Sequence, residues 1–358
     1  MSKPQILIVG AGAVGLAQGY HLSPGASITY LVRPGRKPAF VAPKRLYDYR
    51  ENALRVFDNY RVIESTSEVA GEEFLFVLDT LDGHTARSEG GTATLRAVGA
   101  LIRDTSAFVA YDAIGVDIED HYAESMGISK DRLILACSML VHQPTPEITI
   151  PDTADRKLVA QADLLYICLP GQVGLMTFNT NPKLANALKE AYAKANKVKV
   201  AIQPAFAASL IGIAMLHLVT WNIDGYQPFP HLYANKPLWA LMIRAQSEIL
   251  ALPRFGWTGW AISWVLSSSW ITKKALFETQ VDGAKPMACH EFNAFHHGGK
   301  VVKQDIAALV DLLKDGEKEG RKMVALREVV ERGEETERQK EEARAKAGEG
   351  GEGVRRRV

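Results

Sequence analysis

The stretch "GAGAVG", residues 10–15, restricts the possible fold more than any other part of the sequence. It follows the apolar run "QILIV" and precedes "AVGLAQGYHL", which has the pattern of a helix. In such a unit the first glycine permits a tight turn, the second lets the backbone approach a pyrophosphate, and the third lets the helix pack on the strand. The N–H groups at the start of the helix face the phosphates. The sequence therefore predicts a dinucleotide site formed by Gly10, Gly12, Ala13, Val14 and Gly15.

Short apolar runs alternate with helical patterns through the first half of the chain. Five runs are short, continuous and bounded by turns, as buried parallel strands are: residues 5–10, 27–32, 73–78, 106–111 and 132–137. Two further runs, residues 146–150 and 163–171, are expected to be edge strands of the same domain. Strand alternating with helix predicts an α/β fold with a Rossmann-like, doubly wound parallel sheet.

The second half of the chain follows helical periodicity. Long helices are predicted over residues 205–221, 237–251, 257–278 and 303–331. We therefore expect a nucleotide-binding domain over residues 1–180 and an all-α C-terminal domain over residues 181–331. Residues 332–358 are charged and have no core residues, which predicts a disordered tail.

Composition excludes several classes of protein. The 358 residues are 47% hydrophobic and carry a net charge of only +1, which gives no basic surface for nucleic acid. The three cysteines are widely spaced and form no zinc pattern, so a reducing cytoplasm is expected and no metal is predicted. Residues 205–221 are apolar enough to suggest a membrane span. Because His217 lies among them, we expect a buried helix and no membrane association.

A basic cluster follows the second predicted strand. An NAD site usually places Asp or Glu there to bind the ribose 2′-hydroxyl. This chain has Arg33, Arg36 and Lys37 instead, and guanidinium groups match phosphate oxygens well. The cluster favours NADP as the cofactor, with a solvated basic loop as the alternative.

The opening of the chain resembles that of the ketopantoate reductase (2-dehydropantoate 2-reductase) family. "ILIVGAGAVGLAQGYHL" and the later "ITYLVRPGR" are similar to that family's first strands, including Arg33 in the phosphate-binding turn. The order of a Rossmann-like domain and an all-α domain is similar too. The resemblance implies an NADP-dependent reductase with its active site between the two domains.

The chain departs from that family where the family places its catalytic residues. The resemblance implies a lysine where this chain has Thr80, and an Asn-Gly pair where it has Asp112 and Ala113. It also implies a general-acid lysine and an asparagine on the first long helix of the second domain, yet residues 200–221 contain neither. The family's glutamate falls near Ala288 when Asn293 is the anchor, and Glu291 lies one helical turn away.

Three side chains are therefore predicted to carry out proton transfer: Asp112, His290 and Glu291. Asp112 follows a predicted strand on the edge where ligands of open α/β sheets bind. Its alternative role is a turn or helix-cap carboxylate. His290 titrates near neutrality and could replace the missing lysine. A metal site formed with His296 and His297 is the less favoured role, because no matching carboxylate accompanies them. Thr80 is assigned to the cofactor site.

Four tryptophans recur at helical spacing in the second domain: Trp257, Trp260, Trp264 and Trp270. Aromatic side chains at this spacing more often form a core than a ligand cage. Together with the uncharged residues 205–221, they also suggest a cleft with apolar walls, which suits a bulky apolar substrate.

The leading hypothesis is an NADP-dependent oxidoreductase that reduces a bulky, largely apolar carbonyl, imine or enone compound in specialised metabolism. A non-redox cyclase, isomerase or lyase on the same fold is the first alternative. A catalytically inactive nucleotide-binding protein is the second. The expected partners are a small-molecule substrate and a second copy of the chain, which could pair through the helical domain as a homodimer.

Overall fold

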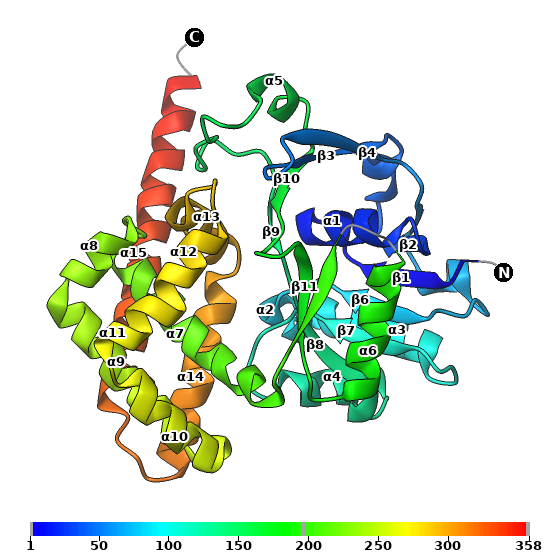
Figure 1. Ribbon diagram of the computed structural model, residues 1–358. Helices are drawn as coiled ribbons and strands as arrows, with labels where there is room; N and C mark the ends of the chain where they lie inside the picture. The colour runs from blue at the N-terminus through cyan, green and yellow to red at the C-terminus, as the bar shows by residue number, and fades with distance from the viewer. Residues whose placement is uncertain (1–2, 195–197, 356–358) are drawn as a thin grey trace. The chain divides into compact units, whose positions relative to one another are not determined.

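The computed structural model describes residues 3–194 and 198–355, with side chains described as far as residue 346. The chain divides into two compact units (Figure 1). The first unit comprises Met1–Ile211 and the returning segment Thr279–Phe292, and the second comprises Gly212–Glu278 and Asn293–Val358. The first unit extends past residue 180 because a strand over Lys199–Gln203 pairs within its sheet.

The first unit contains an eight-stranded sheet. Its strands, in spatial order, are β12 (Lys199–Gln203), β11 (Val173–Phe178), β8 (Leu133–Ser138), β7 (Phe108–Tyr111), β6 (Phe76–Asp79), β1 (Gln5–Val9), β2 (Ser27–Leu31) and β5 (Arg61–Ile63). Every neighbouring pair is parallel except β8 and β11. All five predicted parallel strands lie together in this sheet, so the Rossmann-like fold class is confirmed.

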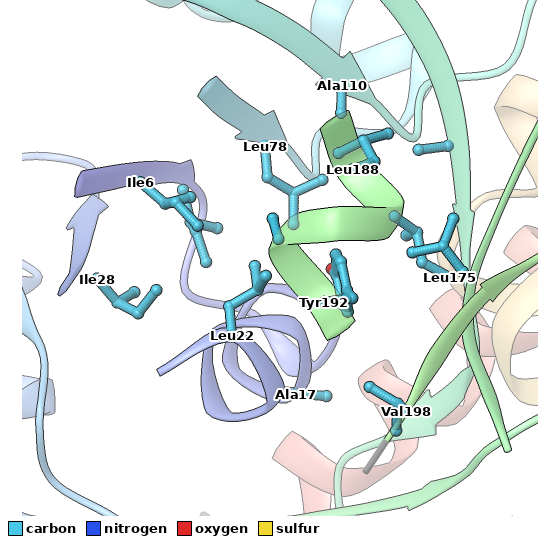
Figure 2. Packing of buried hydrophobic residues seen from close by; sticks show 14 of the residues in the cluster. Ile6, Ala17, Leu22, Ile28, Leu78, Ala110, Leu175, Leu188, Tyr192 and Val198 are labelled. Carbon is cyan, nitrogen blue, oxygen red and sulfur yellow. The ribbon is translucent and has the colours of Figure 1, made fainter. Parts of the chain in front are cut away.

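Helices cover both faces of this sheet, as a doubly wound fold requires. Residues of α1 (Ala13–Leu22) and α6 (Pro182–Ala193) share one core cluster with alternate strand residues such as Ile8. Figure 2 shows Leu188 and Tyr192 of α6 beside Leu78 and Ala110 of the sheet. On the opposite face, α3 (Glu89–Ile102) and α4 (Ile118–Met126) pack against the intervening residues of the same strands. Successive strand residues point to opposite faces, which explains the two clusters.

A second, four-stranded sheet was not predicted from the sequence. Its order is β4 (Ala53–Phe57), β3 (Lys44–Asp48), β10 (Leu164–Ile167) and β9 (Leu140–His142). The expectation of a strand over residues 146–150 is wrong, because that segment forms turns and loop. Pro144, Pro146 and Pro151 bracket it, and proline cannot donate to a strand ladder.

Short helical elements complete the first unit. They are η1 (Lys37–Phe40), η2 (Thr66–Val69), α2 (Gly83–Arg87), η3 (Lys130–Arg132), α5 (Arg156–Val159), η4 (Ala205–Leu210), α12 (Thr279–Gly283) and α13 (Cys289–Phe295), the last of which continues into the second unit.

The second unit is helical in the part of the chain described. Its elements are α7 (Ile211–Ile223), α8 (Phe229–Ala234), α9 (Lys236–Leu250), η5 (Pro253–Phe255), α10 (Gly256–Leu266), α11 (Ser269–Ile271), η6 (Thr272–Glu278), η7 (His296–Lys300), α14 (Val302–Lys318) and α15 (Val324–Arg355). Its core is aromatic: Phe229 and Phe277 stack with centroids 4.9 Å apart, and Trp221 and Trp239 pack edge-on or tilted around them.

The other four tryptophans are not core residues, so the core prediction for them is wrong. The exposed fractions are 79% for Trp257, 62% for Trp260, 70% for Trp264 and 64% for Trp270. The stripe at helical spacing is real, but α10 buries its opposite side, with Gly259 and Leu266. Periodicity identifies a face of a helix and cannot say which face is covered.

The charged C-terminal segment is helical as far as Arg355, where the sequence predicts disorder. It is rich in Glu, Lys, Arg and Ala, which are good helix formers. Its first part binds the body of the unit, because buried Asn222 donates to Glu337 Oε1 at 2.8 Å and accepts from Lys340 Nζ. A truncation that spares these contacts must begin beyond residue 340.

Among the described helices, Ala205–Ile223 is the only one long and apolar enough to cross a membrane by length and composition, and half of its most apolar window is buried within the protein. Nine residues of α7 are buried. They include His217, whose Nε2 bonds Gln246 Oε1 at 2.7 Å.

Candidate functional site

The three glycines of the first turn adopt the geometry that a dinucleotide site needs. Gly10 has a φ of +91°, a backbone conformation that residues other than glycine rarely adopt. A Cβ at Gly15 would lie 2.1 Å from the Gly10 carbonyl oxygen, so only glycine lets α1 approach β1 this closely. A Cβ at Gly12 would meet nothing within 4 Å, which leaves open space beside the backbone. This open space suits the close approach of a pyrophosphate.

The N-terminus of α1 is available to bind an anion. Its N-cap, Gly12, provides no side-chain hydrogen bond, and no acidic residue lies in the first turn. Ala13 and Val14 open the helix, so their N–H groups belong to the set without an intrahelical partner. Because those groups and the helix dipole attract negative charge, this end of the sheet fits a dinucleotide pyrophosphate.

Thr80 supports this turn from the neighbouring strand end. Its hydroxyl donates to the Val9 carbonyl at 2.8 Å, and a Cβ at Gly10 would lie 2.7 Å from Thr80 Oγ1. Thr80 therefore contacts the cofactor turn directly. The Thr80 hydroxyl is uncharged and already donates its proton to the Val9 carbonyl. It therefore cannot supply the positive charge that a lysine would.

The basic turn after β2 is exposed, and acidic residues already contact part of it. Lys37 Nζ pairs with Glu68 Oε2 at 3.1 Å. The Lys37 backbone N–H donates to Glu64 Oε1 at 2.7 Å. Backbone N–H groups of Lys37 and Gly35 hold the pKa of Glu64 below its usual range, which identifies the turn as a binding site for negative charge. The guanidinium groups of Arg33 and Arg36 have no partner among the described residues.

Two carboxyl groups lie at the ends of β6 and β7, at the same edge of the sheet: Asp79 is the last residue of β6, and Asp112 follows β7. The Asp112 backbone N–H donates to the Asp79 carbonyl at 3.0 Å, which fixes the two strand ends side by side. Asp79 is buried, and its carboxylate accepts from Tyr122 Oη at 2.7 Å and from the Leu81 N–H at 2.9 Å. Burial raises the pKa of Asp79 to about 6.

Asp112 is the most perturbed carboxyl group of this edge. Burial, opposed by a hydrogen bond from the Ser138 backbone N–H, raises its pKa to about 8, and the negative charge of Asp79 raises it further. The Asp112 residue is half-buried. At neutral pH it is therefore a carboxylic acid that can donate a proton.

A buried polar network behind Asp112 escaped the sequence analysis. Gln18 of α1 is fully buried, and its Nε2 donates to Ser138 Oγ at 2.7 Å and to the Gly174 carbonyl at 2.8 Å. Tyr192 Oη donates to Gln18 Oε1 at 2.6 Å. The single signal in the sequence is a glutamine on the otherwise apolar first turns of "AVGLAQGYHL". The network holds the end of β8, whose Ser138 N–H reaches Asp112.

The structure does not bring the other predicted proton-transfer residues into contact with Asp112. Glu291 of α13 accepts from the Thr149 N–H at 2.6 Å and from Thr149 Oγ1 at 3.0 Å, so both carboxylate oxygens bind a loop. His290 lies on the same helix and is partly exposed. Asp82, another polar residue of the strand ends, caps α2 through Thr85.

The histidine-rich segment has no metal-binding arrangement among the described residues. His297 Nδ1 instead bonds Asp305 Oδ2 at 2.8 Å within the second unit. Burial and the charge of His297 hold the pKa of His296 well below its usual range.

Comparison of the fold identifies similar solved structures, although no family model and no curated protein matches the sequence. The 2-dehydropantoate 2-reductase of Methylococcus capsulatus superposes with a TM-score of 0.62 at 16% identity, over 94% of this chain and 97% of that one. A D-mandelate dehydrogenase solved with NADH and anilino(oxo)acetate gives a TM-score of 0.63 at 11% identity, over 94% and 99%. A ketopantoate reductase of Staphylococcus aureus, described as dimeric, gives 0.59 at 10% identity, over 94% and 99%.

These matches show that the chain has the fold of ketopantoate reductases over nearly its whole length. The resemblance predicted from the first forty residues is confirmed at the level of fold, at low sequence identity. A fold at this identity does not carry its activity with it. The chemistry must be argued from the residues of this chain.

Proposed function

We propose that this protein is a nicotinamide-dependent oxidoreductase in which Asp112 donates the proton to the reduced product. The observation that carries the proposal is the Asp112 carboxyl, whose pKa is about 8, at the sheet edge that also holds the glycine turn. In the doubly wound fold ligands bind at this edge. A reductase needs a proton donor there, and Asp112 replaces the lysine that ketopantoate reductases use.

Each group of the edge has a defined task in this proposal. A bound nicotinamide would supply hydride to an electrophilic carbon. Gly10, Gly12 and Gly15, with the N–H groups of Ala13 and Val14, would bind the pyrophosphate. Asp112 would place its proton on the oxygen or nitrogen that becomes negative, and the Ser138 N–H would hold its carboxyl in position. Asp79 raises the proton affinity of Asp112 and thereby keeps the acid protonated near neutral pH.

The substrate class follows from what the edge lacks. Recognition of a small keto acid needs a cation for its carboxylate, and Thr80 and Asp112 stand where the resembling family has a lysine and an asparagine. Neither Thr80 nor the protonated Asp112 supplies that cation, and the ionised Asp79 would repel a carboxylate. We infer a bulky, largely apolar carbonyl, imine or enone substrate, in cytoplasmic specialised metabolism. His290 remains the alternative proton donor, and Glu291, bound to Thr149, is assigned to holding its loop.

NADP is the cofactor we propose, with Arg33 and Arg36 as the residues that bind its 2′-phosphate. Both guanidinium groups are exposed and without a partner among the described residues, so they can bind a phosphate without first breaking an ion pair. We also propose that the chain forms a homodimer, as the Staphylococcus aureus ketopantoate reductase does.

Titration of the cofactor and of the reaction tests the proposal. NADPH binding, followed by its fluorescence, should weaken by about 10- to 150-fold in Arg33→Ala, because a charge-assisted hydrogen bond is worth about 1.5–3 kcal/mol. The wild type should oxidise NADPH stoichiometrically with apolar carbonyl compounds and hardly at all with ketopantoate. An unchanged dissociation constant in Arg33→Ala would refute the phosphate assignment. Brisk reduction of ketopantoate would refute the substrate class.

A further inference from the structure

The exposed tryptophans of the second unit form an apolar surface that the proposed reaction does not use. Here it is called the tryptophan face: Trp257, Trp260 and Trp264 of α10, Val265 beside them, and Trp270 of α11, all more than half exposed. Residues 255–272 contain no charged residue. Helices without charge on any side are normally buried.

The area of this face is at the upper end of what an isolated chain usually leaves in water. A buried aromatic side chain covers about 150–250 Å², so the four exposed tryptophans present roughly 400–700 Å² of apolar surface. Monomeric proteins rarely show larger apolar patches than about 300–600 Å². A standard protein interface buries about 800 Å² on each partner. The tryptophan face is thus large enough for the apolar centre of one stable interface.

Two serine hydroxyls of the face already have acceptors, so covering them costs little. Ser263 Oγ donates to the Trp260 carbonyl at 2.7 Å, and Ser267 Oγ donates to the Trp264 carbonyl at 2.8 Å. Trp260 and Trp264 pack edge to face with centroids 5.9 Å apart, which restricts their rotamers before any partner binds. Burial would leave no serine hydroxyl without a partner and would order few side chains.

The charged residues next to the tryptophan face indicate whether a membrane or a protein would cover it. Arg254, just before it, pairs with Asp315, and Lys273 and Lys274, just after it, pair with Glu278 at 3.1 and 2.6 Å. Helices that lie on membranes carry free Lys or Arg for anionic headgroups. An apolar centre with paired charges at its edge is instead the anatomy of a protein interface.

We propose that the tryptophan face binds the same face of a second copy of this chain, with twofold symmetry. A twofold interface places the same patch on both subunits, which an uncharged aromatic surface satisfies without a separate complementary site. Tryptophan is the residue type that most often dominates the binding energy of such interfaces. The proposal locates the homodimer proposed above and does not depend on the reaction.

Sedimentation equilibrium of the full chain tests the proposal. The wild type should sediment at twice the chain mass of 39.3 kDa, and Trp264→Glu should sediment as a monomer. Loss of one central tryptophan should raise the dissociation constant at least about 30-fold. The matched control is Val41→Glu, which places the same charge at an 83% exposed apolar residue of the first unit and should remain dimeric. Both variants should keep the wild-type circular dichroism and NADPH affinity.

Two results would overturn the proposal. One is a wild type that stays monomeric up to about 100 µM, or a Trp264→Glu variant that stays dimeric. The other is sedimentation of the wild type with neutral phosphatidylcholine vesicles that Trp264→Glu abolishes, because the occupant would then be a membrane. If Trp264→Glu fails to fold, Trp257→Gln at the other end of α10 replaces it. Because NADPH affinity is measured on the same samples, failure of the cofactor proposal is seen separately.

Discussion

The two ends of one sheet edge have diverged to different degrees. At the β1–β2 end, the turn with Gly10, Gly12 and Gly15 has the geometry of a dinucleotide site down to the single position where a Cβ would meet open space. At the β6–β8 end, Thr80 and Asp112 stand where the resemblance to ketopantoate reductases implies a lysine and an asparagine. Both ends belong to the same sheet. The difference between them therefore lies in whether the backbone or the side chains form the site.

The glycine end works through the backbone, and the carboxyl end works through side chains. A methyl group at Gly15 would collide with the Gly10 carbonyl oxygen, so that position cannot change without moving α1. At the other end, a side chain can be exchanged while Asp79 and Asp112 keep their strand hydrogen bonds. A turn whose geometry depends on the backbone can therefore be retained where side-chain chemistry is replaced.

The largest expected effect is at the carboxyl end. Asp112→Asn removes the acidic proton while keeping the shape of the side chain, so turnover of the true substrate should fall about 10²- to 10⁴-fold. NADPH affinity should stay within about twofold, because the change is far from the pyrophosphate turn. Single-turnover kinetics and fluorescence titration measure the two quantities. Equal losses in both would show that the two ends do not work separately.

The pH dependence of the wild type sharpens this prediction. Because the acid must carry its proton, turnover should fall as pH rises through about 8, the pKa of Asp112. The folded pKa lies above the unfolded value of about 3.9, so the contribution of Asp112 to stability is fully present below about pH 4 and is lost as pH rises to about 8. The loss is at most about 1.4 kcal/mol per pH unit, and the part between about pH 6 and 8 should be absent from Asp112→Asn. Asp79→Asn should move the activity midpoint to lower pH.

The second prediction concerns the glycine end. Gly15→Ala should destabilise the protein by about 1–3 kcal/mol or more, because overpacking forces backbone shifts. Gly12→Ala is the matched control, since its Cβ would meet nothing. It should keep the melting temperature and lose cofactor affinity. Thermal unfolding with and without NADPH measures both effects. Similar melting temperatures for the two variants would contradict the packing role of Gly15.

Much of the fold could be predicted from the sequence because its signals are local. The five parallel strands are short apolar runs, and the glycine turn has a fixed spacing, so each is visible within about ten residues. The four-stranded sheet was missed because β3 and β4 are half polar, with sequences "KRLYD" and "ALRVF". Only their pairing with β10, more than a hundred residues away, makes them strands.

The site could be predicted only in part, because its chemistry depends on contacts between distant segments. Asp112 was identified from its place after a strand, but its raised pKa arises from burial and from Asp79, which no local pattern reveals. Gln18 and Tyr192 are 174 residues apart and meet only in the folded chain. For the same reason, the tryptophan stripe predicted a helix face correctly and its burial wrongly.

The third prediction uses a residue that links the two ends. Gln18 lies on α1, the helix that begins at the glycine turn, and it binds Ser138 next to Asp112. Gln18→Leu should cost about 1–3 kcal/mol of stability, because it leaves the buried Tyr192 hydroxyl without its acceptor. It should also shift the pH midpoint of turnover without changing NADPH affinity. A change in stability alone would reduce Gln18 to a core residue.

Tyr192→Phe is the control for this variant. It removes the hydroxyl that Gln18 binds and keeps the ring, so it should destabilise less than Gln18→Leu. Because Gln18 would keep its bonds to Ser138 and Gly174, the pH midpoint should stay at the wild-type value. A shift in both variants would mean that the whole network, and not Ser138 alone, positions Asp112.

The smallest effect is expected at the rim of the glycine end, where a side chain does enter the cofactor site. Glu64 accepts the Lys37 N–H at 2.7 Å, so its carboxylate occupies an anion site of the turn that carries Arg33. A 2′-phosphate must displace or tolerate this charge, whereas the 2′-hydroxyl of NADH can donate to it. Glu64→Gln should therefore tighten NADPH binding by up to about tenfold and weaken NADH binding slightly. Calorimetric titration with 2′,5′-ADP and with ADP isolates the phosphate end of the cofactor from the nicotinamide.

Glu68→Gln is the control for this prediction. It releases Lys37, whose pair with Glu68 spans 3.1 Å, and leaves the turn's backbone hydrogen bonds intact. If Glu64→Gln weakened 2′,5′-ADP as much as Arg33→Ala, Glu64 would be a structural part of the phosphate turn, and this rim would be governed by the backbone like the rest of the glycine end.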